Sequence, residues 1–246
     1  MQKWVEGKVA AQQRWTERLF SLKVDADIPF EAGQFAKLAL DVEGERIARP
    51  YSFVNAPDER PNEFYYVTLP DGPLTQRLCR LKAGDGIYLA PRPAGFLALS
   101  EVPDGENLWL ISTGTGLGPF LSILKTEAPW KRFERVVLVH AVRLAEELTH
   151  RDVVDRLVRA RAERMRAVSF VSREAAAGAL PGRVPAAIED GRLEAVTGVA
   201  LSAEKSQVMI CGNPAMVTDT SAVLARRGMK KHRRRDPGHI TVENYW

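Results

Sequence analysis

The sequence predicts a chain of two domains, an antiparallel β-barrel followed by an α/β domain built on a parallel sheet. Two observations support this. The first hundred residues contain short strand patterns separated by Gly and Pro clusters, whereas the remainder alternates strand and helix patterns. The polar stretch 99–107, LSEVPDGEN, separates the two. We therefore expect domains at 1–100 and 101–246, a length that allows two cores of ordinary size.

The first half is expected to form six strands and one short helix. The helical pattern at 73–81 places Leu74, Leu78 and Leu81 on one face, and Pro73 suits a first turn. The expected strands are 5–10, 19–24, 34–40, 47–54, 64–69 and 86–90.

The second half is expected to form a parallel sheet covered by helices on both faces. Asn213 and Pro214 are typical of an N-cap and a first helical turn, and Gly228 can end the same helix. The expected strands are 108–112, 135–142, 167–172 and 207–211, and the expected helices are 119–124, 147–161, 184–190 and 215–227.

Composition indicates a globular cytoplasmic protein without a metal centre. No stretch has the length of uninterrupted apolar residues that a membrane span needs, so we expect no membrane association. Cys79 and Cys211 lie far apart and form no C-x-x-C pair, and the four histidines have no metal-binding spacing. Any redox chemistry must therefore use a bound organic cofactor.

The run ISTGTGLGPFL at 111–121 falls between the first strand and the first helix of the second half. It fits neither the G-x-G-x-x-G fingerprint nor the Walker pattern. Such a turn lies at the carboxyl edge of a parallel sheet, where backbone N–H groups and a helix N-terminus attract a phosphate. The alternative is that Gly114, Gly116 and Gly118 only form a tight turn.

Three arginines occupy strand ends or nearby loops in the second half. Arg143 ends the second strand, where an arginine suits the 2'-phosphate of NADP, and Arg173 and Arg183 follow the third strand. Together they could converge on one phosphate. Alternatively, they are ordinary surface arginines.

The net charge of +4 conceals a local basic run at 226–235, with seven positive charges and no acid. The run has three interpretations: a solvated helix end, a docking surface for an acidic protein, or a nucleic-acid patch. It lacks the interleaved aromatics of a nucleic-acid site, so we expect no nucleic-acid partner. We favour docking.

Three ordered motifs, R-P-Y-S at 49–52, G-T-G-L-G-P at 114–119 and C-G-N-P at 211–214, resemble the ferredoxin–NADP reductase family. The ending V-E-N-Y-W resembles its bacterial branch, which serves flavodoxin and ferredoxin. The resemblance spans nearly the whole chain. It implies a Greek-key FAD-binding β-barrel, an NADP-binding α/β domain and a C-terminal tail that returns to FAD.

The activity implied by the resemblance is electron transfer between NADPH and a one-electron carrier, ferredoxin or flavodoxin. Hydride would pass to FAD N5, and the electrons would leave singly through the semiquinone. The alternatives are a reductase component of an oxygenase or a free flavin reductase on the same fold, and a binding protein that has kept the fold but lost the cofactor. The protein is expected to be a monomer that docks its acidic carrier at Arg233, Arg234 and Arg235.

By the same resemblance, Ser52, Cys211 and Glu243 are the catalytic candidates. Ser52 would lie near FAD N5 and Cys211 beside the nicotinamide. Glu243 would relay a proton, the alternative being a solvated glutamate. The residues matched to FAD contacts are Arg49, Pro50, Tyr51, Ser52, Tyr65, Pro73, Leu74, Thr75, Tyr245 and Trp246. Those matched to NADP contacts are Thr115, at the flavin–nicotinamide junction, with Val142, Arg143, Ser172, Arg173 and Arg183.

Overall fold

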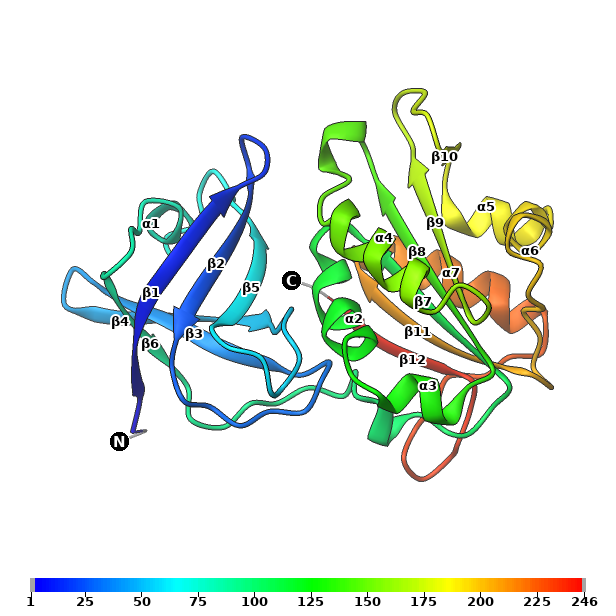
Figure 1. Cartoon of the computed structure of the whole chain (residues 1–246), viewed down its shortest axis with the longest axis horizontal. Helices are drawn as coiled ribbons and strands as arrows, with labels where there is room; N and C mark the ends of the chain where they lie inside the picture. The colour runs from blue at the N-terminus through cyan, green and yellow to red at the C-terminus, as the bar shows by residue number, and fades with distance from the viewer. Residues whose placement is uncertain (1–2, 245–246) are drawn as a thin grey trace.

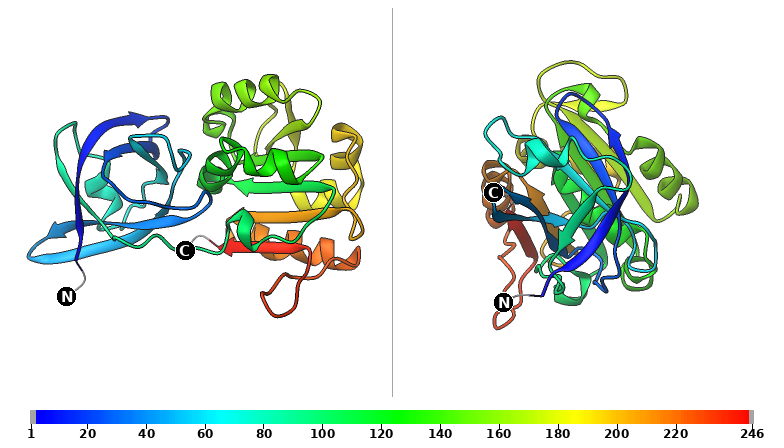
Figure 2. Two further views of the ribbon diagram at one scale, coloured as in Figure 1. Left: turned by 60° about the horizontal axis from the view of Figure 1, so that its bottom comes forward. Right: turned by 90° about the vertical axis from the view of Figure 1, so that its left-hand side faces the viewer.

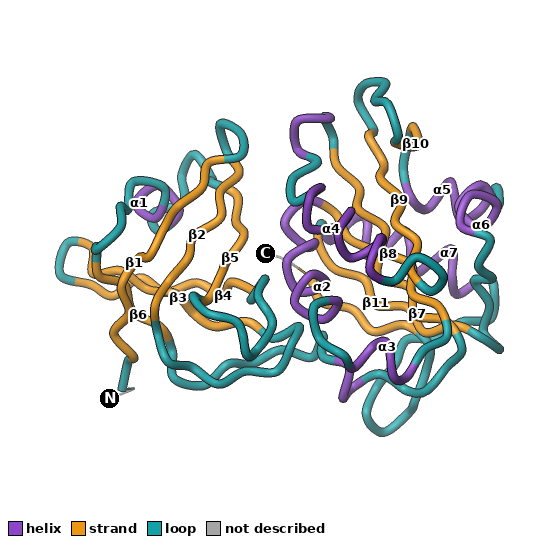
Figure 3. The backbone as a smooth tube through the Cα atoms, in the orientation of Figure 1, coloured by secondary structure: helices purple, strands orange, loops and turns teal. Residues whose placement is uncertain are grey.

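The chain folds around two six-stranded sheets that lie side by side (Figure 1). The computed structural model describes residues 3–244. Most of the helices surround the second sheet, as Figure 3 shows. The change from the first sheet to the second falls between Leu89 and Asn107. The expected architecture, a barrel followed by an α/β half, is confirmed.

The first sheet is an antiparallel barrel with the strand order β4-β3-β6-β1-β2-β5. β6 lies between β3 and β1, so that β6, β3, β4 and β5 follow a Greek-key path. The edge strands β4 and β5 meet at a bridge between Phe53 and Phe64, which closes the barrel. The strands are β1 (Val5–Arg14), β2 (Leu19–Asp25), β3 (Phe35–Val42), β4 (Glu45–Ser52), β5 (Asn62–Val67) and β6 (Gly86–Leu89).

The second sheet is parallel throughout, with the order β10-β9-β8-β7-β11-β12. Its strands are β7 (Asn107–Thr113), β8 (Arg135–Val142), β9 (Met165–Val171), β10 (Ala179–Pro181), β11 (Ser206–Gly212) and β12 (Ile240–Asn244). The two outermost strands, β10 and β12, were not expected from the sequence. Each has only three to five residues, which is too short for a clear period.

Helices cover both faces of this sheet, as expected (Figure 2). α2 (Leu117–Leu124), α3 (Ala128–Arg132) and α4 (Arg151–Ala160) pack on one face, against Leu108, Leu138 and Met209 among others. α5 (Val184–Glu189), α6 (Arg192–Thr197) and α7 (Pro214–Arg226) pack on the other face. Asn213 caps α7, because its side chain accepts hydrogen bonds from the N–H groups of Ala215 and Met216.

Two helices are shorter than the sequence patterns suggested. The pattern at 147–161 is divided: a 3-10 turn (Ala145–Glu147) is followed by α4, which begins only after His150 because that residue adopts a left-handed φ of 56°. In the barrel, α1 (Thr75–Leu78) is a single turn. Leu74 and Leu78 are nonetheless buried in the barrel core.

The two halves share a continuous apolar core. Leu19, Val54 and Tyr65 from the barrel are buried in the same cluster as Leu117 and Phe120 of α2. The connecting segment is not fully solvated, since it includes a 3-10 turn (Leu99–Glu101) whose Leu99 is buried in that cluster. Packing therefore fixes one sheet against the other.

Within residues 3–244, no helix combines the length and apolarity needed to cross a membrane. The same residues include no group of three or more His, Cys, Asp or Glu side chains that could hold a metal ion.

Candidate active site

The topology of the second sheet creates a crevice between β7 and β11. From β7 the chain continues to β8 on one side, whereas from β11 it continues to β12 on the other. α2 and α7, which follow these two strands, accordingly pack on opposite faces. Ligands of open α/β sheets bind outside the carboxyl ends of the strands at such a switch point. The turns after β7 and β11 are therefore the place to look for a site.

Glycines allow these two turns to pack backbone against backbone. A Cβ at Gly116 would lie 2.6 Å from the carbonyl oxygen of Cys211. A Cβ at Gly212, where φ is +131°, would lie 2.7 Å from the carbonyl oxygen of Thr113. The Thr113 hydroxyl also accepts a hydrogen bond of 2.9 Å from the N–H of Asn213. No larger residue fits at either glycine without moving the backbone.

The three glycines of the ISTGTGLGPFL run have three different roles. Gly114 adopts a φ of +53° and has no atom within 4 Å of its would-be Cβ, so it faces open space. Gly116 fits against β11, and a Cβ at Gly118 would lie 3.3 Å from Val54 of the barrel. The motif thus joins three parts of the protein, and only its first glycine leaves room for a ligand.

His140 supports this turn from behind. It lies in the middle of β8, is almost fully buried, and its Nε2 is 3.1 Å from the carbonyl oxygen of Gly114. Burial lowers its pKa to about 4, so the ring is neutral at neutral pH. Because a carbonyl only accepts hydrogen bonds, Nε2 must carry the hydrogen. Sequence reasoning treated this histidine as an ordinary residue, although a polar residue within the apolar run VVLVHAV was a signal.

A cavity of about 570 Å³ opens at the switch point. Its other wall comes from the barrel, through Arg18, Leu19, Val67 and Leu69. The cavity thus lies between the two sheets. The predicted NADP contacts that line it are Thr115, Val142, Arg143, Ser172, Arg173 and Arg183.

The three arginines of this cavity come from adjacent strand ends. The N–H of Arg173 donates to the carbonyl oxygen of Arg143 at 2.9 Å, which continues the β8–β9 pairing past the strands. Arg183 follows β10, which pairs with β9. Within residues 3–244, none of their guanidinium groups forms a hydrogen bond or an ion pair. Two acids, Glu147 and Asp219, also line the cavity, and the Glu147 carboxylate accepts hydrogen bonds from the N–H groups of Arg143 and Leu144.

The R-P-Y-S segment lies on the edge strand β4. Arg49 and Pro50 are exposed, Tyr51 is half-buried and Ser52 is buried. The Tyr51 ring meets Tyr66 edge-on at 5.9 Å between centroids, and burial raises the pKa of its phenol. Within residues 3–244, the Arg49 guanidinium donates one hydrogen bond, to the adjacent carbonyl of Ala48 at 2.8 Å. An arginine and one flat aromatic face thus lie at the barrel edge.

The 73–75 turn offers a bound FAD mainly backbone groups. Leu74 is buried in the barrel core, so its side chain cannot reach a ligand. The Thr75 hydroxyl is engaged within the protein, since it accepts from the N–H of Leu69 at 3.1 Å and donates to the carbonyl of Gly72 at 3.4 Å. Pro73 is exposed.

Glu243 is not a solvated residue. It lies on β12 directly beside Cys211 of β11, which is fully buried. Its Oε2 is buried without a hydrogen-bond partner among the described residues. Burial raises the pKa of this carboxyl to about 7, an effect that a backbone hydrogen bond from Phe96 partly offsets.

Phe35 of β3 and Glu243 of β12 both lie close to Gly95. Phe35 pairs with Ser52 across β3 and β4, and it lies 3.2 Å from the would-be Cβ of Gly95. Glu243 Oε1 lies 3.3 Å from the same point. Cys211 and Glu243 are therefore neighbours in the second sheet, and the barrel residue that pairs with Ser52 lies close to Glu243.

The remaining predicted FAD contacts are Tyr65, Tyr245 and Trp246. Tyr65 is buried between the sheets, where its phenol oxygen accepts a hydrogen bond from Thr149 at 2.8 Å. Tyr245 and Trp246 lie outside the described residues.

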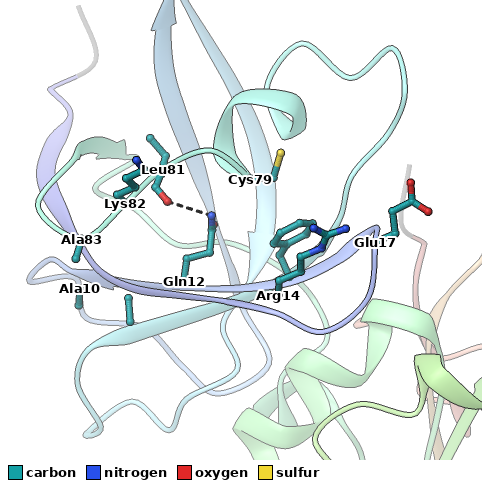
Figure 4. Close-up of a pocket in the computed structure, with 10 residues that line it drawn as sticks. Ala10, Gln12, Arg14, Glu17, Cys79, Leu81, Lys82 and Ala83 are labelled. Carbon is teal, nitrogen blue, oxygen red and sulfur yellow. Dashed lines mark hydrogen bonds between the residues drawn. The ribbon is translucent and has the colours of Figure 1, made fainter.

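A second hollow, of about 820 Å³, lies on the barrel surface (Figure 4). It is lined by Gln12, Arg14 and Cys79, with Gln12 donating to the carbonyl of Leu81 at 3.1 Å. It contains none of the predicted site residues. The predicted nucleotide contacts gather instead in the cavity between the two sheets.

Comparisons with known proteins agree with this geometry. Residues 110–222 match a family model described as the oxidoreductase NAD-binding domain. A flavodoxin/ferredoxin–NADP reductase of Escherichia coli is 50% identical over 248 residues, which covers 100% of both chains. A ferredoxin–NADP reductase of Pseudomonas aeruginosa is 34% identical and covers 96% of this chain and 95% of its own.

Among solved structures, a ferredoxin NADP+ reductase from Neisseria gonorrhoeae with bound FAD and NADP superimposes with a TM-score of 0.93. It is 34% identical and covers 99% of both chains. The FAD/NAD-binding domain of a nitric oxide dioxygenase from Vibrio cholerae has a TM-score of 0.79 at 21% identity, which shows a shared fold alone.

Proposed function

Because the chain belongs to the flavodoxin/ferredoxin–NADP reductase family, we propose that it binds FAD at the barrel edge and NADP(H) in the cavity between the sheets. The protein is an NADPH-linked electron-transfer enzyme. The observation that supports the location most strongly is the 570 Å³ cavity, in which three arginines without ion partners among the described residues meet the glycine turn.

The residues at both places fit the two cofactors. When bound, FAD supplies the chemistry of accepting a hydride and passing on single electrons. Arg49 offers a guanidinium for the pyrophosphate, and Tyr51 offers a ring for the flavin. Gly114 leaves open space beside Thr115, where a nicotinamide nucleotide can approach the backbone.

The three arginines suit the 2'-phosphate of NADP. Guanidinium groups form charge-assisted, often paired hydrogen bonds to phosphate oxygens. Ser172 adds a hydroxyl at the same edge of the sheet, and the exposed rim lets the phosphate enter. The Glu147 carboxylate accepts hydrogen bonds from two backbone N–H groups, which partly offset its repulsion of the phosphate.

Ser52, Cys211 and Glu243 provide a buried polar corner at the junction of the two cofactors. A carboxyl with a pKa near 7 holds a proton half the time at neutral pH. We assign to Glu243 the role of holding that proton on its carboxyl and releasing it into the junction. Cys211 lies beside Glu243 on the adjacent strand β11, Ser52 ends β4 of the barrel, and we assign to both the orientation of the reacting groups.

The Glu243 assignment predicts a pH effect. In the parent protein, carrier reduction should rise as pH falls through about 7, whereas Glu243→Gln should show a flatter profile. The free energy of unfolding gives an independent readout. Because the folded protein keeps a proton that the unfolded chain loses above the ordinary pKa of 4.5, the parent should lose stability between pH 4.5 and about 7. Glu243→Gln should lack that decline.

The exposed Glu163→Gln serves as the control for both measurements, since its carboxylate lies on the surface. A parent-like pH profile and a parent-like decline in stability in Glu243→Gln would remove Glu243 from the mechanism.

We propose that the acidic carrier, ferredoxin or flavodoxin, docks at the basic run 226–235. Much of its charge is neutralised within the protein: Arg226 pairs with Glu189 at 2.7 Å, Lys230 with Asp236 at 2.6 Å, and Arg227 with Glu194. Arg234, a predicted docking residue, pairs with Glu101. Among the described residues, Arg233 and Arg235 have no ion-pair partner. They are the stronger candidates for carrier contact.

The function is tested by comparing NADPH-driven reduction of an acidic carrier with reduction of free flavin. We expect flavin absorption bands in the purified protein and a preference for the carrier. Arg233→Gln combined with Arg235→Gln should raise the KM for the carrier roughly tenfold at low salt, with the effect disappearing at high salt.

Reduction of a small acceptor such as ferricyanide is the control for that variant and should not change. A preference for free flavin would favour the flavin-reductase alternative, and the absence of flavin bands with no uptake of added FAD would remove the enzymatic proposal.

We further propose that the protein acts as a monomer. The large exposed apolar residues in the described part of the chain are Leu69, Leu144 and Val196, and Leu69 borders the cavity already described. Sedimentation at micromolar concentration measures the oligomeric state. The cytoplasmic location stays a prediction.

A further inference from the structure

Six side chains from the two sheets form a buried polar cluster behind the cavity. We call it the junction cluster: Trp15, Ser21, Glu63, Tyr65, Thr149 and His150. The first four belong to the barrel and its first loop, and the last two precede α4. None belongs to the three sequence motifs, and the mechanism above does not use the histidine.

The imidazole of His150 is the centre of the cluster. It is 3% exposed, and its ring centroid lies 4.6 Å from that of Trp15 and 4.8 Å from that of Tyr65. Its Nε2 lies 3.3 Å from Ser21 Oγ and 3.4 Å from Glu63 Oε1. The ring therefore contacts four barrel side chains, two through their rings and two through Nε2.

The other ring nitrogen connects the cluster to Tyr65. Nδ1 lies 3.0 Å from Thr149 Oγ1, which donates to the Tyr65 phenol oxygen at 2.8 Å. Trp15 donates from its indole to Ser21 Oγ at 3.0 Å. Every polar group of the cluster is thus hydrogen-bonded, which is what a buried network needs to be stabilising.

Glu63 supplies a negative charge to this interior. Burial raises its pKa, but the His150 hydrogen bond and the charges of His150, Lys125 and Lys23 outweigh it, and the net shift is downward. Its side chain is 14% exposed. Removing the histidine would leave a buried carboxylate without its main partner, a costly arrangement.

The backbone conformation at position 150 favours glycine, yet the residue there is a histidine. Its φ of 56° is in the left-handed region, which costs free energy for a residue with a side chain. A glycine would adopt this conformation without that cost. The contacts of the imidazole offset the strain, and α4 begins at the next residue.

The junction cluster is adjacent to the cavity. Tyr65 lies two residues from Val67, and Ser21 two residues from Leu19, and both neighbours line the cavity. On its other side, the Cβ of Tyr65 lies 3.9 Å from the would-be Cβ of Gly118 in the glycine motif. A change in the cluster would therefore shift the barrel wall relative to the glycine turn.

We propose that His150 is a positioning residue: its contacts with Glu63 and Tyr65 fix the barrel against the α/β half and so set the separation of the two cofactor sites. His150 is not among the residues that line the cavity. The proposal rests on the proposed function, because the sites that it aligns are those of FAD and NADP(H). Hydride transfer depends steeply on separation, and a misplacement of about 1 Å can cost roughly 100-fold in rate.

The test uses the holoenzyme with His150→Gly, Glu63→Gln and the double variant. Glycine removes the ring but keeps the left-handed backbone, so α4 should begin unchanged. Arg156→Ala on α4 is the matched control, since its side chain is 62% exposed and its ion-pair partner within residues 3–244 is Asp152. His150→Asn is the substitute if the glycine variant does not fold, because asparagine tolerates the left-handed region.

Two readouts separate positioning from general stability. In a single turnover with NADPH, we expect His150→Gly to slow flavin reduction about tenfold while the KM for NADPH changes less than about twofold. In the absence of substrate, amide hydrogen exchange should accelerate at 63–67 and 147–154. The double variant should be no slower than the worse single variant, since both substitutions remove the contact between His150 and Glu63.

Unchanged flavin reduction, or additive effects of the two substitutions, would overturn the proposal. So would unchanged exchange at 63–67. If the parent protein reduces no flavin with NADPH, the proposed function fails, whereas the exchange measurement still reports whether His150 holds the two halves together.

Discussion

Replacing Arg143 and Arg173 together with glutamine should raise the KM for NADPH by about 100-fold or more and change the KM for NADH by less than about threefold. Hydrogen bonds to charged groups contribute about 1.5–3 kcal/mol each, so each guanidinium accounts for roughly a tenfold to hundredfold preference. NADH lacks the 2'-phosphate and would not lose these bonds. Steady-state kinetics with both nucleotides measures the difference.

The control is Arg159→Gln, an exposed arginine of α4 outside the cavity, which should change neither constant. Arg183→Gln alone tests whether the third arginine takes part. An equal rise in both Michaelis constants for the Arg143 and Arg173 variant would mean that these side chains support the fold or the shared part of the nucleotide.

Gly212→Ala should destabilise the protein far more than Gly114→Ala, although both glycines have positive φ values. At Gly114 the new Cβ meets open space, and only the left-handed backbone costs free energy, about 1–2 kcal/mol. At Gly212 the backbone is strained and the new Cβ lies 2.7 Å from the Thr113 carbonyl oxygen, so β7 and β11 must separate. Strain and overpacking together should cost about 3–5 kcal/mol.

Urea unfolding monitored by circular dichroism compares the two alanine variants with the parent. The slope with denaturant should stay constant, so that the midpoints report stability. Equal midpoints for the two variants would show that β7 and β11 are not packed as closely as the structure indicates. Gly228→Ala, with a positive φ and no close neighbour, is a second reference for the cost of the backbone alone.

Local sequence patterns were sufficient for the two sheets and for most of their strands. The strand patterns of the first half and the apolar runs of β7, β8 and β11 are visible in the sequence itself. Arg143 and Arg173 could be expected at one edge because each ends a strand of the same parallel sheet. These inferences needed no knowledge of how distant segments pack.

Features that depend on the junction of the two halves could not be predicted in this way. The burial of Glu243 follows from the pairing of β12 with β11, and β12 is a five-residue strand after a basic loop. His150 appeared to continue a helical pattern, because nothing in its neighbours shows that Glu63 and Tyr65 approach from the barrel. The close fit of Gly116 against Cys211 likewise joins residues 95 positions apart.

The strand pairing also orders events during synthesis. Every ladder of the first sheet lies between Val5 and Leu89, so the barrel can close before the second sheet exists. Its Leu19, Val54 and Tyr65 belong to a core that is complete only with Cys211. At roughly 5–20 residues per second, a ribosome takes about 6–24 s to add the intervening chain. For that interval the nascent barrel presents an uncovered apolar side, which makes this the stage at which a chaperone would bind.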